Sequence, residues 1–410
     1  MNERNLKVYG YRWVVLLVFV LLAAMTQVLW ITFAPITGAA AKAFGQSDLM
    51  IGLLSMVFMV VYVLIVIPSA WVIDTLGFKT AVGIGAVLTG VFGLARGLLA
   101  GSFTGVFLCQ AGLAVGQPFV LGAITTLAAR WFPARERATA VGLGTLALYI
   151  GPLIAMFLTP PLLLKVGMAR MLTIYGVAAA AAALLVLLLA RDRPPTPAGR
   201  EERALMFDGL KAMLRRKDFL FLLAIFFVGL GVFNAVSTWI EDIVRPRGFS
   251  IAQAGRLGGL MLVGGIVGAI VMPLLSDKLR RRKPFLVLAV AGLLPGLLGL
   301  TFAADVRLLM VSGFFVGFFL LSAGPIGFQY AAEITHPAPE GTSNSLLLVA
   351  GQISGIAFIM GMDALKDKAT GSMSLPLVGL TGLVGAAILL AAFLPESPAC
   401  EESRKFDTLG

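Results

Sequence analysis

The sequence predicts an all-α membrane protein with twelve transmembrane helices in two pseudo-symmetric six-helix bundles and both termini in the cytoplasm. Apolar residues make up 59% of the 410-residue chain and charged residues only 13%, against about 25% in a typical soluble domain. The apolar residues also lie in long runs, each near the length of about 20 residues that crosses a bilayer. Since no soluble protein of this size could bury so much apolar surface, lipid must surround most of the chain.

Twelve apolar runs meet this length requirement, and their positions define the predicted organisation. They cover residues 13–37, 51–73, 80–100, 103–130, 138–160, 171–190, 219–241, 253–276, 284–302, 306–331, 344–363 and 375–394. The connections are short except for residues 191–218, whose Arg, Pro and Glu content cannot form a buried core and predicts a linker. The predicted domains are an N-terminal bundle over 1–190, this linker, a C-terminal bundle over 219–395 and a cytoplasmic tail over 396–410.

The end of the linker alternates apolar and basic residues. The apolar members are Leu205, Leu210, Met213 and Leu214, and the basic members are Lys211, Arg215, Arg216 and Lys217. Such a pattern is typical of a short basic helix that lies on the membrane surface. A solvated linker without a helix is the alternative.

The net charge of +11 comes from Lys and Arg residues placed between the apolar runs. Most of the 32 Lys and Arg residues fall on segments that share one side with the N-terminus, which the positive-inside rule assigns to the cytoplasm. This distribution predicts a multi-pass protein of the cell membrane and excludes nucleic acid as a partner. We expect a monomer whose partners are the lipid bilayer and a small solute.

Residues that could hold a metal or perform catalysis are scarce. The chain has two cysteines, Cys109 and Cys400, and a single histidine, His336. Their spacing fits neither a disulfide nor a zinc or haem-iron site, and no nucleophile or base lies deep in a run as an enzyme would need. The first run is too long for a cleavable signal peptide and is followed by further spans. We therefore expect no cofactor, no metal and no enzymatic activity.

Landmarks in the two halves recur at nearly one spacing, which indicates duplication. Asp74 follows the second run and Asp277 follows the eighth, 203 positions later. Pro133 follows the fourth run and Pro337 the tenth, 204 positions later. A period shared by two independent landmarks indicates an internal repeat. Two six-span halves joined by a long cytoplasmic linker are the organisation of an alternating-access transporter.

The acidic-Gly-basic turn over residues 74–79, and its counterpart over residues 277–283, resemble the cytoplasmic motif of the major facilitator superfamily. The resemblance covers nearly the whole chain, although Ala70 and Phe78 stand where that motif usually has Gly and Arg. In that superfamily the turn bridges helices at the cytoplasmic face and steadies the outward-facing state. The resemblance implies this role for Asp74 and Lys79, with Asp277 and Arg281 as counterparts; ordinary loop charges are the alternative.

Ionised residues avoid the central thirds of the runs. Arg96, Glu241, Asp242 and Arg256 lie near predicted outer ends, and Arg130 and Glu333 near inner ends. Carriers driven by protons or sodium usually need a carboxylate at depth. Its absence favours uncoupled, facilitated transport, with coupling through Glu241 or Asp242 left open.

The run centres instead carry uncharged polar and aromatic residues. The candidates for a solute site are Gln27, Trp30, Gln117, Tyr149, Phe233, Asn234 and Gln352. Glutamine is costly against lipid, so the three glutamines should face the protein interior. Hydrogen bonding between packed helices is the alternative for each glutamine. For Trp30 the alternative is packing or lipid contact, although a mid-span position is poor for the interfacial tryptophan belt.

Several segments resemble the feline leukaemia virus subgroup C receptor-related family. They are Trp30-Ile31, residues 54–59 and 68–74, the run from Gln117 to Phe132, Pro160-Pro161, and residues 340–345 leading to Gln352. Members of that family are uniporter-type carriers for choline and ethanolamine, and some have been linked to haem export. The resemblance implies that Trp30 supplies a ring face to a quaternary ammonium and that Gln117 and Gln352 line the pocket. A cation attracted by aromatic faces needs no buried counter-charge.

The sequence departs from that family at the seventh span. The family's choline carriers have a tyrosine opposite the tryptophan, and our alignment places Asn234 there, 204 positions after Trp30. Half of the expected cage is therefore missing unless Phe233 or Tyr149 substitutes. Glu241 and Asp242 replace neutral residues at the outer mouth, where they could attract cations.

Two functions remain after this comparison. The first is a uniporter-type carrier for a choline-like organic cation. The second is a proton-coupled efflux antiporter for drugs or metabolites, because Gly151-Pro152 resembles part of an antiporter motif. Haem export is a weaker, family-based possibility. No segment outside the spans is large enough for a receptor that binds a macromolecule.

Overall fold

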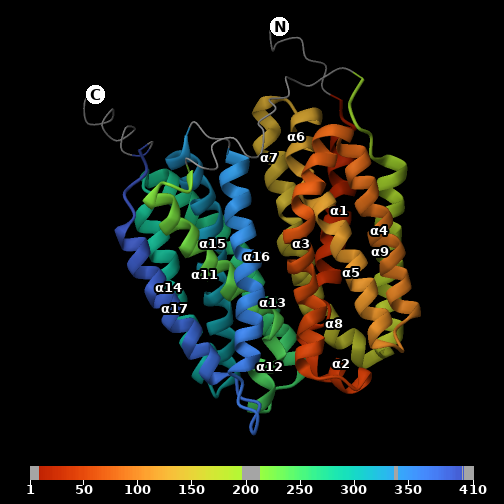
Figure 1. Ribbon diagram of the computed structural model, residues 1–410, viewed down its shortest axis with the longest axis vertical. Coiled ribbons are helices and arrows are strands. Elements are labelled where there is room, and N and C mark those ends of the chain that lie inside the picture. The colour runs from red at the N-terminus through yellow and green to blue at the C-terminus, as the bar shows by residue number, and fades with distance from the viewer. Residues whose placement is uncertain (1–8, 196–212, 337–339, 399, 401–410) are drawn as a thin grey trace. The chain divides into compact units, whose positions relative to one another are not determined.

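The computed structural model describes residues 9–195, 213–336, 340–398 and 400 of the chain (Figure 1). Within these ranges it contains twelve helices that are long and apolar enough to cross a membrane, which confirms the predicted fold class. The spans cover Arg12–Phe44, Asp48–Leu76, Phe78–Leu98, Phe103–Trp131, Thr139–Val166, Met168–Leu189, Lys217–Thr238, Ile251–Leu279, Lys283–Phe302, Val306–Thr335, Thr342–Ala364 and Ser374–Phe393.

The chain divides into two compact units, Met1–Arg203 and Ala204–Gly410, and each contains six of the spans. The division falls inside the segment that the sequence analysis predicts as a linker. The predicted basic surface helix lies mostly on residues 196–212, which are outside the described residues. Its last turn is described: Met213 is buried, whereas Leu214, Arg215 and Arg216 are exposed.

The N-terminal unit contains broken as well as continuous spans (Figure 1). Its helices are α1 (Arg12–Ile31), η2 (Ala34–Ile36), α2 (Thr37–Phe44), α3 (Asp48–Leu76), α4 (Phe78–Leu98), α5 (Phe103–Leu121), α6 (Ile124–Trp131), α7 (Ala134–Thr145), α8 (Ala147–Val166) and α9 (Met168–Leu189). The first span breaks after Ile31, where Pro35 follows in the short 3₁₀ turn. Pro35 has no N–H to donate to the Ile31 carbonyl, which interrupts the α-helical hydrogen-bond ladder at this point.

The C-terminal unit repeats this plan. Its helices are α11 (Lys217–Thr238), α12 (Ile240–Val244), η3 (Arg245–Arg247), α13 (Ile251–Leu279), α14 (Lys283–Phe302), α15 (Val306–Thr335), α16 (Glu340–Ala364) and α17 (Ser374–Phe393). The span that begins with α11 breaks at Trp239, as the first span breaks after Ile31. A capping box between Ser250 and Gln253 starts α13 by satisfying two of its free backbone N–H groups.

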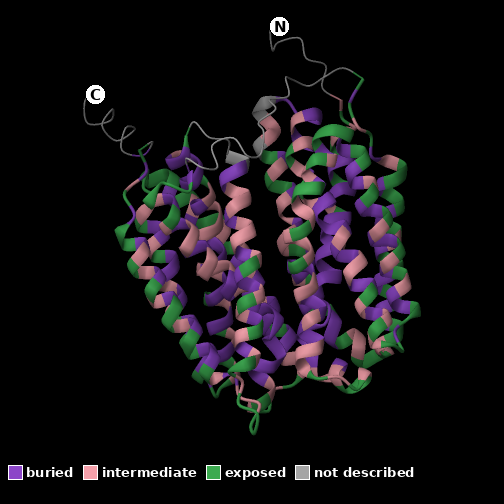
Figure 2. Cartoon of the chain, viewed as in Figure 1, coloured by how far each residue is buried: buried purple, intermediate pink, exposed green. Residues whose placement is uncertain are grey.

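The helices bury one face and leave another face exposed (Figure 2), and both faces are apolar. Along α9, Met171, Leu172 and Tyr175 are buried, whereas Ile174 and Leu188 are exposed. An apolar exposed face fits lipid rather than water as the surrounding solvent. Because lipid gives no hydrophobic drive to helix association, the helices of each unit pack through close contacts of small residues. The described chain is therefore a multi-pass membrane protein.

Candidate functional site

Trp30 is held in place by a reciprocal pair of hydrogen bonds between α1 and α3. Its indole N–H donates to the carbonyl oxygen of Ser55 over 3.2 Å, and the Ser55 hydroxyl donates to the Trp30 carbonyl over 3.4 Å. The side chain is 8% exposed. Because the N–H is already engaged, the ring faces are the part of Trp30 that a solute could contact.

Gln27 lies one turn before Trp30 on α1 and is 5% exposed. Its Nε2 has no hydrogen-bond partner among the described residues. A buried amide without a partner costs about 1–3 kcal/mol, so this donor is a candidate for binding a solute acceptor. The two other predicted residues of this unit, Gln117 and Tyr149, lie on α5 and α8, which both pack against α1.

Gly151 allows α8 to approach α1 beside Gln27. A Cβ atom at Gly151 would lie 2.4 Å from the carbonyl oxygen of Ala24 and 2.5 Å from the Cβ of Gln27. The Gly151-Pro152 step thus has a packing role in this unit. Its value as a sign of an antiporter is correspondingly smaller.

We expect Gly151→Ala to lower the free energy of unfolding by about 1–3 kcal/mol, because the added methyl group must push two helix backbones apart. Thermal unfolding in detergent would measure the change. Gly142→Ala is the matched control, since nothing lies within 4 Å of a Cβ at Gly142. Equal melting temperatures for the two variants would contradict the packing role.

In the C-terminal unit, Asn234 of α11 binds the backbone of α16 next to Gln352. The Asn234 side-chain amide donates to the carbonyl oxygen of Gly351 over 3.2 Å, directly before Gln352 in the chain. Asn234 is buried, and Gln352 and Phe233 are half-buried. The structure therefore places the Asn234 side chain against the backbone directly before Gln352, and a shared solute site stays a prediction.

Arg96 is fully buried at the end of α4, beside the break that follows α1. Its Nη1 donates to the Leu29 carbonyl over 3.0 Å and to Gln110 Oε1 over 2.8 Å. Gln110 in turn donates to the Leu54 carbonyl over 2.9 Å. Arg96 and Gln110 thus bind the carbonyls of Leu29 and Leu54, the residues that directly precede Trp30 on α1 and Ser55 on α3. The sequence analysis noted Arg96 but not Gln110, because nothing in the sequence pairs the two.

A cluster of buried charges lies at the α12 end of the C-terminal unit. Asp242 is fully buried, with Arg245 Nη2 at 2.8 Å and Lys366 Nζ at 2.9 Å. Glu241 is 2% exposed, with Arg245 Nη1 at 3.7 Å. Two cations therefore compensate two carboxylates, and the cluster ties α12 to the segment that follows α16.

At the linker end of the N-terminal unit, three segments meet at the Asp192 carboxylate. Arg130 Nη1 lies 2.7 Å from both carboxylate oxygens, and the Lys79 N–H donates to Oδ1 over 3.1 Å. Gly77, with φ +89°, forms the turn, and a Cβ there would lie 2.8 Å from Asp192 Oδ1. The motif turn thus has its glycine because both the backbone angle and the ion pair require one. Asp74 is exposed in the last turn of α3.

Asp192 lies in the segment that the sequence analysis predicts as the start of the linker. The structure binds this segment to the bundle instead, since the Trp131 indole N–H also donates to the Arg191 carbonyl over 3.1 Å. The first linker residues therefore belong to the cytoplasmic-motif contacts of the N-terminal unit. Composition suggested a free linker because it carries no information on these long-range partners.

The C-terminal unit has a related arrangement around Arg282. Arg282 forms ion pairs with Asp277 and with Glu333, the latter at 3.1 Å, and its N–H donates to Glu396 Oε1 over 2.7 Å. Burial lowers the pKa of Arg282, but its hydrogen bonds to Asp277 and Glu333 outweigh burial and raise the pKa above the usual value. Glu333 and Glu396 stand 203 and 204 positions after Arg130 and Asp192, so the repeat extends to these contacts.

Arg282, rather than the expected Arg281, is the basic partner of Asp277. The chain turns at Arg280, with φ 48°, and the Arg281 carbonyl accepts a hydrogen bond from the Ser276 hydroxyl over 2.7 Å. This turn directs the following guanidinium, that of Arg282, to Asp277. Arg282 also lies 203 positions after Lys79, the offset that separates Asp74 from Asp277.

Comparison with known proteins decides the family of this chain. Residues 15–359 match the family model of the Major Facilitator Superfamily. The chain belongs to the major facilitator superfamily. The D-xylose-proton symporter structure, which is 16% identical, covers 95% of this chain and 99% of its own with a TM-score of 0.74. That likeness confirms the superfamily fold.

Two named relatives narrow the position within the superfamily. Solute carrier family 49 member A3 of Xenopus tropicalis is 31% identical over 88% of this chain and 79% of its own. Choline/ethanolamine transporter FLVCR1 of Felis catus is 30% identical over 86% of this chain and 68% of its own. The chain is thus a superfamily transporter related to the FLVCR transporters, which confirms the resemblance seen in the sequence. The superfamily and these relatives are transporters rather than enzymes.

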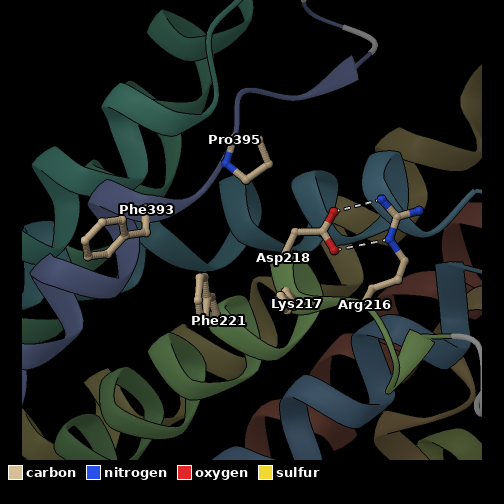
Figure 3. A pocket seen from close by; sticks show the side chains of 6 residues that line it. All are labelled: Arg216, Lys217, Asp218, Phe221, Phe393 and Pro395. Carbon is tan, nitrogen blue, oxygen red and sulfur yellow. Dashed lines mark hydrogen bonds and ion pairs between the residues drawn. The ribbon is translucent and has the colours of Figure 1, made fainter.

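Two pockets lie on the C-terminal unit, and neither is lined by a predicted solute-binding residue. One, of about 420 Å³, is at the linker end, with Phe221 and Phe393 on one side and the Arg216–Asp218 pair on the other (Figure 3). The second, of about 410 Å³, lies among α11, α16 and α17 and has only apolar side chains. Such an apolar groove suits contact with lipid chains. Among the described residues, no group of three or more His, Cys, Asp or Glu could hold a metal ion.

Proposed function

We propose that the chain is a uniporter-type carrier for a choline-like organic cation that works by alternating access. The observation that carries the proposal is the fixed indole of Trp30, whose N–H is bound to the Ser55 carbonyl, so that a cation would contact the ring rather than the N–H. A cation over an indole face gains roughly 0.5–2 kcal/mol, and more when it is desolvated. The FLVCR1 relative, named for choline and ethanolamine, supports the same solute class.

An uncharged polar side chain one turn from Trp30 also supports the proposal. Gln27 presents a buried donor without a partner, and a hydroxyl or other oxygen of the solute would satisfy it. No carboxylate is needed beside a permanent cation, because the aromatic face supplies the attraction. A site of this kind does not change its charge with pH, which supports transport without a coupled proton.

Proton-coupled efflux is the second candidate, and the Glu241–Asp242 cluster favours it. These are buried carboxylates close to the α11 residues Asn234 and Ser237 in the chain. The close approach of Arg245 and Lys366 to Asp242 counts against it, since two cations stabilise the ionised form of that carboxylate. The uniporter proposal therefore comes first.

Uptake of labelled choline and ethanolamine into proteoliposomes, with and without an imposed pH gradient, tests the proposal. We expect saturable uptake that does not depend on the gradient and is absent from protein-free liposomes. Uptake of neither amine, beside a reconstituted carrier that works, would exclude this solute class. Uptake that requires the gradient would replace the uniporter by the coupled mechanism.

The orientation and the membrane are also part of the proposal. The Lys and Arg distribution supports cytoplasmic termini and a cytoplasmic linker, and we propose the cell membrane as the site and a monomer as the working form. Both native cysteines are buried, so a Lys278→Cys variant places a thiol at an exposed position in the basic last turn of α13. Labelling of this thiol in sealed cells by a membrane-impermeant reagent, before and after permeabilisation, tests the orientation. Labelling only after permeabilisation is expected.

A further inference from the structure

The two pockets of the C-terminal unit follow one another along the same pair of helices, α11 and α17. The pocket at the linker end includes Phe221 of α11 and Phe393 of α17. The second pocket includes Leu220 and Leu390, each within one turn of a residue of the first pocket, and reaches Val228. We call the two pockets together the α11–α17 groove, which starts at the linker end of the unit.

The depth of the groove is close to that of one leaflet of a bilayer. An α-helix rises about 1.5 Å per residue, so Lys217 and Val228 lie about 16 Å apart along α11. On α17, which runs in the opposite direction, Leu383 and Phe393 lie about 15 Å apart. Half of the hydrocarbon core of a bilayer is also about 15 Å thick. The groove therefore matches an acyl chain of the leaflet on the linker side.

The walls of the groove are apolar and open to the surroundings. Phe393 is 74%, Ile353 47% and Leu383 42% exposed. All side chains that line the second pocket are apolar, and they come from three helices, α11, α16 and α17. A chain in this hollow contacts protein on several sides, which increases its dispersion attraction over that on a single helix face.

The mouth of the groove carries an excess of positive charge. Arg216 binds the Asp218 carboxylate through two hydrogen bonds of 3.1 and 2.8 Å, so this pair is neutral. Lys217 lines the same pocket (Figure 3), Arg215 lies just before the pair, and both are exposed. The nearby Glu396 carboxylate instead accepts hydrogen bonds from N–H groups at the start of α14. Basic residues at the end of a span attract anionic lipid head groups.

The geometry points to a binding site for an anionic phospholipid, with its head group at Arg215 and Lys217 and an acyl chain in the α11–α17 groove. The site lies within the C-terminal unit and contains none of the predicted solute-binding residues. The inference therefore goes beyond the proposed transport, which its failure would leave untouched. A second copy of the chain fits this surface less well, because it would bring two basic mouths together.

Titration of the delipidated protein with single lipids tests the inference. Native mass spectrometry in detergent would count bound phosphatidylglycerol and phosphatidylcholine, whose chains can be matched and whose head groups differ in charge. We expect one phosphatidylglycerol to bind with an apparent Kd about tenfold or more below that of phosphatidylcholine. Equal affinities would overturn the inference. Displacement of the lipid by an equal concentration of inorganic phosphate, or a dimer that excludes the lipid, would overturn it as well.

A charge variant tests the position of the head group. Arg215→Gln with Lys217→Gln should weaken phosphatidylglycerol by about tenfold and change phosphatidylcholine by less than about twofold. The matched control is Lys278→Gln with Arg281→Gln, which removes the same charge from exposed residues of this unit that line neither pocket. Equal weakening in the two double variants would show that the lipid binds elsewhere and would overturn the assignment.

A groove variant tests the position of the acyl chain. Ala386 is an exposed residue of the second pocket, and Ala386→Phe would fill part of the hollow. We expect it to weaken phosphatidylglycerol by about fivefold or more. Ala178→Phe, at an exposed alanine of α9, should leave the Kd unchanged. An Ala386→Phe protein that binds the lipid as well as the control would overturn the chain site. The titration of the unmodified protein decides the lipid class even where a variant fails to fold.

Discussion

Replacing Trp30 with alanine should abolish saturable transport of organic cations, or raise the apparent KM by at least about tenfold. The substitution removes the ring face whose attraction for a cation is worth roughly 0.5–2 kcal/mol, and more at a desolvated site. It also removes one of the two hydrogen bonds between α1 and α3 at this level, the one to the Ser55 carbonyl, and keeps the one to the Trp30 carbonyl. Initial rates of labelled choline and ethanolamine uptake in proteoliposomes would measure the effect.

Two further variants separate the ring from the hydrogen bond. Trp30→Phe keeps an aromatic face but loses the N–H, so it should retain part of the transport that Trp30→Ala loses. Trp71→Ala, at a 61% exposed tryptophan on α3, should leave uptake unchanged. Full transport by a correctly folded Trp30→Ala protein would show that this ring does not contact the solute.

Replacing Arg96 with alanine should lower the free energy of unfolding by about 3 kcal/mol. The change removes the donor to Gln110 Oε1 and the shorter of two donors to the Leu29 carbonyl in a fully buried place, and an unsatisfied buried polar group costs about 1–3 kcal/mol. It also leaves a cavity beside the break in the first span. Thermal or denaturant unfolding of the purified protein in detergent would measure the loss.

The coupling between Arg96 and Gln110 can be measured by a double-mutant cycle. Arg96→Met with Gln110→Leu should cost less than the sum of the two single variants, because replacing both polar partners avoids leaving one buried and unpaired. Arg170→Ala, at an exposed arginine of α9, should change stability by less than about 0.5 kcal/mol. An Arg96→Ala protein as stable as the Arg170→Ala protein would contradict a supporting role for the buried guanidinium.

The candidate site was only partly predictable. Trp30 and Gln27 could be selected because a tryptophan or glutamine in the middle of an apolar run is unusual by composition alone. The α11–α17 groove gave no such signal, since the side chains of its second pocket are apolar like those of any lipid-facing surface. Only the packing of α11, α16 and α17 separates this hollow from an ordinary span surface.

The residues that bind the two cytoplasmic-motif turns could likewise be predicted only in part. The turns at Asp74 and Asp277 follow from the sequence and its repeat, but the choice of Arg282 over Arg281 depends on the backbone turn at Arg280. Asp192 and Glu396 were missed because each lies more than 110 residues from the N–H groups that it binds. Local patterns do not reach across such separations.

The sequence by itself determined the solvent, the number of spans and the family, because long apolar runs have few outcomes in a bilayer and basic loops mark its sides. The tertiary structure decided which polar groups are satisfied. Whether a buried Arg96, Asn234 or Gln27 binds the protein or is left for a ligand depends on what neighbouring helices bring within about 3 Å. That information is set by packing between distant segments and does not exist in the local order of residues.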